Sequence, residues 1–271
     1  MTTKGSMTYG DVFEVLHAAI ANNIQQIDTS YLYGDAEHII GDFIQQYPEY
    51  ESFSIVSKQR CEKAAEIRSK VEESIDALHV DQLHGLLIHD FMSYIKNPCV
   101  WDELVRIKDD DITDCIGFSL YHPYEIQKIL SDGVIPDLIE IPYNVFDQRF
   151  RLLIPLFETY HIHVHIRSVY LQGILVQQID QLPSFFSPLS SKLKQFRFLC
   201  EQYNVSLLSA ALNFVCKTIH ADQIIIGVDN KDQVYANADV FNKRIPVGLL
   251  DRLQELFVFD ERFINPMNWR I

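Results

Sequence analysis

Short apolar segments with the alternation of β-strands take turns with amphipathic segments of helical spacing along most of the chain. The strand-like segments, in chain order, are IQQID, SFSIVSK, LHGLLIH, DCIGFS, DLIEI, HIHVHIRS and QIIIGV. Helical spacing of apolar residues runs over 11–22, 36–43, 63–78, 100–107, 123–130 and 232–241, and we expect 146–161 to be largely helical too. This regular alternation implies a parallel β-sheet covered by helices.

The number and spacing of these strands favour an α/β fold of the (β/α)8 TIM-type barrel class. The main alternative, a doubly wound open sheet, usually carries a glycine-rich turn after its first strand, and the chain contains no GxGxxG sequence. No Gly/Ser-rich linker or run of charges divides the chain. We therefore expect residues 1–271 to form a single barrel domain.

The start of the sequence departs from the barrel pattern. Helical spacing begins near Asp11, and the preceding MTTKGSMTYG has little strand character, so the predicted barrel lacks a clear first strand. A missing strand leaves two unpaired strand edges, each able to pair with another chain. We therefore expect a remnant strand, a covering loop or a contact between two copies of the chain near residues 1–10. The last of these would make a homo-oligomer through the N-terminal region.

Charge and cysteine content narrow the class of protein. A formal net charge of −14 argues against a nucleic-acid partner, because phosphate binding needs a basic surface. The five cysteines are far apart, form no CxxC pair and are odd in number, which favours reduced thiols over a disulfide framework. No apolar segment is long enough to span a bilayer. We expect a cytoplasmic protein with no membrane partner.

Titratable residues stand at the ends of successive strand-like segments. In a barrel the active site lies at the carboxyl ends of the strands. The residues there are, in chain order, Asp28, Lys58, His89, Ser119, Glu140, Arg167 and Gly227. Each one taken alone is more typical of a solvated surface residue, but acid and base groups that gather at one rim indicate a catalytic cleft.

The first three of these residues form a set with Tyr33, which follows Asp28 in the next turn. A phenol ordinarily titrates near pH 10. A neighbouring ammonium such as Lys58 would lower that pKa by favouring the phenolate, and Asp28 could hold Lys58 in place. His89 could donate a hydrogen bond to a substrate oxygen. Such a site could protonate a carbonyl oxygen while a hydride reaches the carbonyl carbon.

Several motifs that contain these residues resemble those of the aldo-keto reductases. DTSYLYGDAE looks like the family's DTA..YG..E signature, and IVSK and LLIH look like the segments that present the catalytic lysine and histidine. IGFS, IPYN and IIIGVDNKDQVYAN resemble further family segments, in the family's order. The resemblance implies an NAD(P)H-dependent enzyme that reduces a small-molecule aldehyde or ketone on a (β/α)8 barrel. The catalytic residues would be Asp28, Tyr33, Lys58 and His89, with Tyr33 as the proton donor.

The same resemblance implies a set of cofactor-binding positions, and several of them differ from the family's usual residues. The positions are Ser119, Glu140, Arg167, Gly227, Asp229, Gln233 and Asn237. Glu140 stands where the family commonly has Gln, Leu120 where it often has Asn, and Arg167 where an aromatic ring often lies. Asp229 occupies the place of a basic residue that would bind the 2′-phosphate of NADP. We therefore expect a preference for NADH.

Two alternative functions follow from other features of the sequence. The altered cofactor positions and the missing strand would also fit a non-catalytic barrel that serves as a scaffold or regulatory subunit. His161, His163 and His165 alternate along one strand-like segment, which would fit a metal-dependent hydrolase. No Asp, Glu or His set on the other strands completes such a site, so we predict no metal site.

Overall fold

The computed structural model describes residues 7–48, 53–60, 63–241 and 243–269. They fall into two compact units, which are described separately. The first, Met7–Glu140 with Leu156–Val164, is called the N-terminal unit. The second, Ile141–Pro155 with His165–Ile271, is called the C-terminal unit. The expectation of a single domain over 1–271 stays a prediction.

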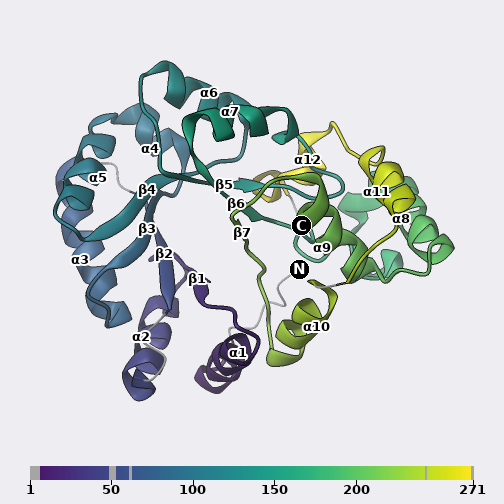
Figure 1. Ribbon diagram of the computed structural model, residues 1–271, viewed down its shortest axis with the longest axis horizontal. Helices are drawn as coiled ribbons and strands as arrows, with labels where there is room; N and C mark the ends of the chain where they lie inside the picture. The colour runs from purple at the N-terminus through teal and green to yellow at the C-terminus, as the bar shows by residue number, and fades with distance from the viewer. Residues whose placement is uncertain (1–6, 49–52, 61–62, 242, 270–271) are drawn as a thin grey trace. The chain divides into compact units, whose positions relative to one another are not determined.

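A parallel sheet forms the centre of the N-terminal unit (Figure 1). Its strands are β1 (Gln26–Asp28), β2 (Ser54–Gln59), β3 (Leu83–Ile88), β4 (Thr113–Ser119) and β5 (Leu138–Pro142), of which β5 belongs to this unit as far as Glu140. Each strand pairs in parallel with the next one in the chain. Parallel pairing in chain order places the carboxyl ends of all five strands at one edge of the sheet.

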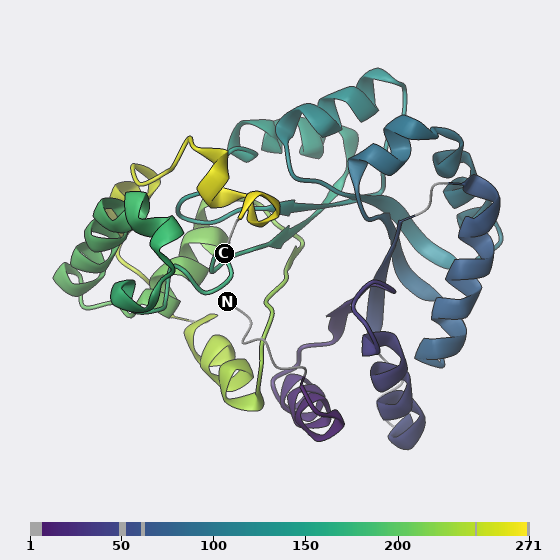
Figure 2. The ribbon, with the colours of Figure 1, turned by 180° about the vertical axis from the view of Figure 1, so that it is seen from behind.

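Helices precede and connect these strands, and all but the short one at Phe91–Lys96 lie in segments that the sequence predicts to be helical. They are α1 (Tyr9–Ala21), α2 (Ala36–Gln46), α3 (Ile67–Leu78), α4 (Phe91–Lys96), α5 (Cys99–Asp109), α6 (Pro123–Ser131) and α7 (Ile154–Tyr160). Helix α3 packs against β2, α5 packs against β4, and α3 and α5 contact each other, so both cover the same face of the sheet (Figures 1 and 2). Thr8 begins α1 with a capping box, in which its side chain and that of Asp11 bond each other's backbone N–H.

Close packing of β4 on β5 depends on one glycine. A Cβ atom at Gly117 would lie 1.6 Å from the carbonyl oxygen of Leu138, its partner in register on β5. On the same sheet, Val56, Leu87 and Leu138 form a fully buried apolar cluster. The near-continuous burial of β2 through β5 is typical of a parallel sheet covered by helices.

The C-terminal unit is mainly helical. It contains β6 (His163–Arg167, from His165 on) and β7 (Gln223–Ile224), which pair in parallel, with α8 (Ser190–Gln202), α9 (Leu207–Thr218), α10 (Lys231–Phe241), α11 (Val247–Gln254) and α12 (Glu261–Ile264). Short 3-10 segments lie at Arg151–Leu153, Ile179–Gln181, Ser184–Leu189 and Pro266–Asn268. Helix α9 packs against α8, α10 and α11, and seven of its residues are buried.

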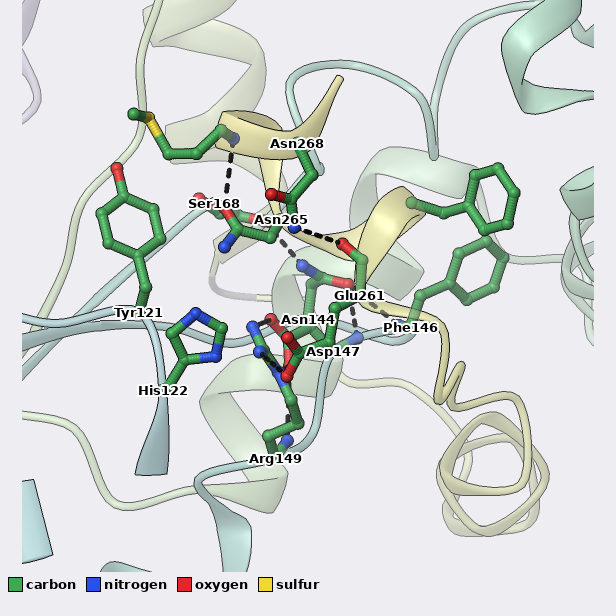
Figure 3. Close-up of polar contacts among 12 residues, drawn as sticks. Tyr121, His122, Asn144, Phe146, Asp147, Arg149, Ser168, Glu261, Asn265 and Asn268 are labelled. Atoms are coloured by element: carbon green, nitrogen blue, oxygen red, sulfur yellow. Dashed lines mark hydrogen bonds and ion pairs between the residues drawn. The ribbon is translucent and has the colours of Figure 1, made fainter. Parts of the chain in front are cut away.

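A polar network fixes the turn after β5 in this unit (Figure 3). The side-chain oxygen of Asn144 accepts hydrogen bonds from the backbone N–H groups of Phe146 and Asp147 at 2.9 and 3.0 Å. The guanidinium of Arg149 donates two hydrogen bonds to the carboxylate of the buried Asp147. It donates a third to Glu261 Oε1 on α12 at 2.8 Å. The asparagine of the IPYN motif thus holds a turn to which the C-terminal segment is tied.

Several elements differ from the sequence-based expectations. Residues 146–153 are not α-helical, because the Asn144 network holds their start as a turn, and α7 begins only at Ile154. Pro155 lies in the first turn of that helix, where no N–H is needed. The predicted strand QIIIGV is reduced to the two residues of β7. Helices α8, α9 and α11 were not predicted.

The expectation for the chain's start falls partly outside the described residues. Residues 1–6 are among those not described, and the rest of the 1–10 segment caps and begins α1. In the described part of the chain, no strand precedes α1. None of the described helices combines the length and the apolarity that crossing a membrane requires.

Candidate active site

The carboxyl edge of the sheet in the N-terminal unit brings six of the predicted site residues together. Asp28 ends β1, Lys58 lies in β2, and His89 directly follows β3. Ser119 ends β4 and is paired in register with Glu140 on β5. The parallel pairing that aligns these strand ends is therefore what assembles the site, and Tyr33 joins it from the turn between β1 and α2.

Lys58 is the centre of the site. Its side chain is only 1% exposed and forms an ion pair with Asp28 Oδ1. Its ammonium also lies 3.3 Å from Glu140 Oε2 and donates to the Thr29 carbonyl oxygen at 3.1 Å. Two carboxyls and a backbone carbonyl therefore compensate one buried ammonium, as burial of a charge requires.

Burial and the neighbouring charges change the pKa values of Lys58 and Asp28. Burial alone would lower the pKa of Lys58, but the Glu140 and Asp28 carboxylates outweigh it and raise that pKa above its ordinary value. Burial, with the neighbouring Glu140, raises the pKa of Asp28 well above its ordinary range, although Lys58 opposes the shift. Lys58 is thus held as an ammonium ion at neutral pH.

The Tyr33 ring lies over Lys58, in reach of solvent. The Lys58 ammonium is 5.4 Å from the centre of the ring. The ring also meets the His89 imidazole edge to face, with the ring centres 5.9 Å apart. Tyr33 is 50% exposed, whereas Lys58 beneath it is buried. The site therefore presents a phenol and an imidazole to incoming molecules and keeps the charges below them.

Ser30 connects His89 to the lysine strand, and sequence reasoning missed it. Its hydroxyl donates to the Lys58 carbonyl oxygen at 3.1 Å and lies 3.0 Å from His89 Nδ1. A hydroxyl has a single proton. When Ser30 donates it to the Lys58 carbonyl oxygen, the hydrogen bond between Ser30 and His89 must use a proton on His89 Nδ1. Neutral His89 would then have an unprotonated Nε2 and donate from that atom only as an imidazolium. The position of Ser30 in DTSYLYG, two residues after Asp28, was the available signal.

The side chains of Ser119 on β4 and Glu140 on β5 are hydrogen-bonded to each other. The Ser119 hydroxyl donates to Glu140 Oε1 at 3.1 Å, and both residues are buried. The Leu120 backbone N–H donates to the Glu140 carbonyl oxygen at 2.8 Å. Glu140 is therefore fixed at both ends, by the backbone of β4 and by the side chains of Ser119 and Lys58.

The other predicted cofactor positions belong to the C-terminal unit. Asp229 donates its backbone N–H to Gln233 Oε1 at 2.9 Å, and Asn237 Nδ2 donates to the Gln233 carbonyl oxygen at 2.7 Å. The Tyr170 hydroxyl donates to Asn237 Oδ1. A Cβ atom at Gly227 would meet no other atom within 4 Å, so its backbone lies open before the start of α10. Arg167, at the end of β6, bonds the Ser168 hydroxyl at 3.4 Å.

The histidines that suggested a metal site do not line one face of a strand. His161 lies in the turn before β6 with a left-handed backbone at φ 56°. His161 and His163 are exposed, whereas His165 is buried. Within the described ranges, no three residues among His, Cys, Asp and Glu come together in a way that could hold a metal ion.

The chain is similar to several known proteins. The sequence profile of the aldo/keto reductase family matches residues 1–256. The chain is 24% identical over 256 residues to the uncharacterized oxidoreductase YqkF of Bacillus subtilis (strain 168), covering 85% of this chain and 82% of that protein. It is 22% identical over 266 residues to L-galactose dehydrogenase of Arabidopsis thaliana, covering 90% and 82%.

A solved structure gives the corresponding match in three dimensions. The holo form of aldo-keto reductase AKR11C1 from Bacillus halodurans superposes with a TM-score of 0.80 at 19% identity, over 93% of this chain and 88% of that one. At this identity the match shows the fold. It confirms the predicted (β/α)8-type barrel, which in the residues that the structure describes has no clear first strand.

The Ser30 contact predicts the protonation state of His89. In the chain without cofactor, nitrogen NMR of labelled histidine should show neutral His89 with its proton on Nδ1. Replacement of Ser30 by Ala should remove this preference and destabilise the protein by about 1 kcal/mol. Ser57→Ala is the matched control, because Ser57 is a buried serine that bonds Glu37 instead. An unchanged His89 signal in Ser30→Ala would contradict the assignment.

Proposed function

Because the chain belongs to the aldo/keto reductase family, we propose that it reduces an aldehyde or ketone by hydride transfer from a nicotinamide cofactor, with Tyr33 as the proton donor. Family membership and the oxidoreductase relatives support NAD(P)H-dependent carbonyl reduction in general. The finer assignment rests on the residues of the N-terminal unit. A cytoplasmic location and a homo-oligomer through the N-terminal region remain predictions beside it.

The observation that carries the proposal is the buried Lys58 ammonium beneath the exposed Tyr33 ring. An ammonium that stays charged favours the phenolate over the phenol, which makes the hydroxyl a better proton donor. Asp28 and Glu140 keep the ammonium in place and charged. Because Asp28, Lys58 and Glu140 all lie in paired strands, the ammonium is in position before a substrate arrives.

The residues of the chain fit a nicotinamide dinucleotide at one end better than at the other. The open backbone at Gly227 and the following N-terminus of α10 suit a phosphate group, because helix N-termini expose N–H donors. At the nicotinamide end, an amide needs both an acceptor and a donor. Ser119 gives its proton to Glu140, and a carboxylate there offers only acceptors. In the C-terminal unit, Gly227, Asp229 and Gln233 would hold the adenosine end. In the N-terminal unit, Ser119 and Glu140 stand at the positions expected for the carboxamide but offer it no donor.

The chain's own groups supply the proton chemistry. When bound, the reduced cofactor supplies the hydride to the carbonyl carbon. Tyr33 donates the proton to the carbonyl oxygen as negative charge develops on it, and Lys58 stabilises the phenolate that remains. His89, positioned through Ser30, bonds the same oxygen when Nε2 carries a proton. The balance of these steps is one hydride and one proton for each carbonyl reduced.

A specific observation also supports the second candidate, a scaffold or regulatory subunit that binds cofactor weakly. The hydroxyl of Ser119 is committed to Glu140 and not available as a donor to a carboxamide. Weak cofactor binding with an intact catalytic set would separate this candidate from an efficient enzyme. Titration with NADH and NADPH, followed by fluorescence, distinguishes the two.

Replacing Tyr33 by Phe tests the proton donor. We expect carbonyl reduction to fall by about 10²–10⁴-fold, the usual contribution of a positioned general acid, while cofactor affinity changes little. Tyr31→Phe is the matched control, because the Tyr31 hydroxyl bonds the Arg60 carbonyl oxygen at 2.8 Å instead. Near wild-type turnover in Tyr33→Phe would remove Tyr33 from the mechanism. Equal losses in both variants would indicate a structural effect.

Replacing Asp229 by Arg tests the choice of cofactor. The 2′-phosphate of NADPH carries close to two negative charges, so a carboxylate at this position disfavours it and an arginine favours it. We expect NADH to bind the wild type better than NADPH by about tenfold, or about 1.4 kcal/mol, and the variant to reverse this preference. Asp239→Arg, which makes the same charge change later in α10, should not. Tight binding of NADPH by the wild type would contradict the assignment.

A further inference from the structure

The charges buried at the carboxyl edge of the sheet do not balance if every group is ionised. Lys58 supplies one positive charge, and Asp28 and Glu140 would supply two negative charges. The Lys58 and Glu140 side chains are 1% and 3% exposed, and that of Asp28 is 14% exposed. An uncompensated charge in such a place is costly, and a buried carboxyl commonly takes up a proton instead.

The contacts of Asp28 point to where that proton sits. Its Oδ1 atom pairs with Lys58, but its buried Oδ2 atom receives no hydrogen bond from any donor in the described part of the chain. The Glu140 carboxyl lies beside that of Asp28, because both contact the same Lys58 ammonium, Glu140 through Oε2 at 3.3 Å. Two carboxylates cannot hydrogen-bond each other, since both only accept, whereas a carboxylic acid and a carboxylate can.

We propose that Asp28 and Glu140 share one proton beside Lys58, which makes Glu140 a positioning residue for the Lys58–Tyr33 pair. The shared proton leaves the buried cluster with one positive and one negative charge. It also joins the end of β1 to β5, with Lys58 between them, so that the ammonium is held from both sides. The raised pKa of Asp28, caused by burial and by Glu140, supports this arrangement.

The other groups that face the pair in this unit leave the proton where it is. Ser119 donates its hydroxyl proton to Glu140 Oε1, so it takes none from the pair. The Lys58 ammonium is a donor only. His89 is engaged with Ser30 through Nδ1, and Tyr33 lies over Lys58 with its ring. The sharing of a proton does not depend on the proposed function; only its consequence for Tyr33 does.

Infrared spectroscopy of the chain without cofactor tests the proposal directly. At neutral pH the wild type should show the C=O stretch of a buried protonated carboxyl, and Glu140→Gln should lose it. Glu125→Gln is the matched control, because Glu125 is another buried glutamate and its carboxyl accepts backbone N–H bonds from Tyr121 and His122 instead. Absence of the band in the wild type, or its persistence in Glu140→Gln, would overturn the proposal.

The pH dependence of the free energy of unfolding gives a second measurement, which counts the protons taken up on folding. A carboxyl whose pKa is raised on folding binds a proton that the unfolded chain has released, so stability falls as pH rises from about 4 to the folded pKa. In that window the wild type should take up about one more proton on folding than Glu140→Gln does. Asp28→Asn should lose the same proton. Identical proton uptake by all three proteins would overturn the proposal without touching the activity of Tyr33.

Discussion

The buried Lys58 ammonium is the interaction on which the rest of the site depends. Two carboxyls lie against it. One comes from β1, which pairs with the lysine strand β2, and the other comes from β5, which pairs with β4. Tyr33 and His89 rest above it, at the solvent side. Removal of the ammonium would leave two acids facing each other without a counter-ion. The sheet edge therefore has to keep its register for the charges to stay compensated.

That register comes from features that have nothing to do with chemistry. Gly117 lets β4 approach the backbone of β5, and the pairing of Ser119 with Glu140 follows from it. The apolar cluster of Val56, Leu87 and Leu138 holds β2, β3 and β5 behind the site. The positions of the polar groups therefore depend on a core of close-packed aliphatic side chains.

The positions of three of the proposed catalytic residues could be predicted because each of the three ends a strand-like segment. Asp28, Lys58 and His89 follow apolar segments directly, and parallel strands bring such ends together whatever the loops do. The contacts between them could not be predicted in the same way. The sequence does not show that the Ser30 hydroxyl turns toward His89 or that Glu140 faces Lys58, because such contacts depend on side-chain directions across strands.

Several helices of the C-terminal unit could not be predicted from the local sequence pattern. Residues Ser209–Val215 of α9 are all buried, and they include the polar Ser209 and Asn213, so polar residues do not mark a solvent-facing side of this helix. The turn at Asn144 looks helical in the residues that follow it, but four side-chain hydrogen bonds to Asn144 and Asp147 hold it in another conformation. Local patterns fail where burial is uniform or where one polar side chain overrides propensity.

The most direct test of this account is the free energy of unfolding of Lys58→Met, measured against that of the wild type from neutral to acidic pH. The variant should be less stable at neutral pH by about 3–5 kcal/mol, the usual cost of leaving a buried charge without its partner. The deficit should shrink as the pH falls and the carboxylate that remains in the Asp28–Glu140 pair takes up a proton. A deficit that stays constant over the whole pH range would contradict the central place given to the lysine and its two carboxyls.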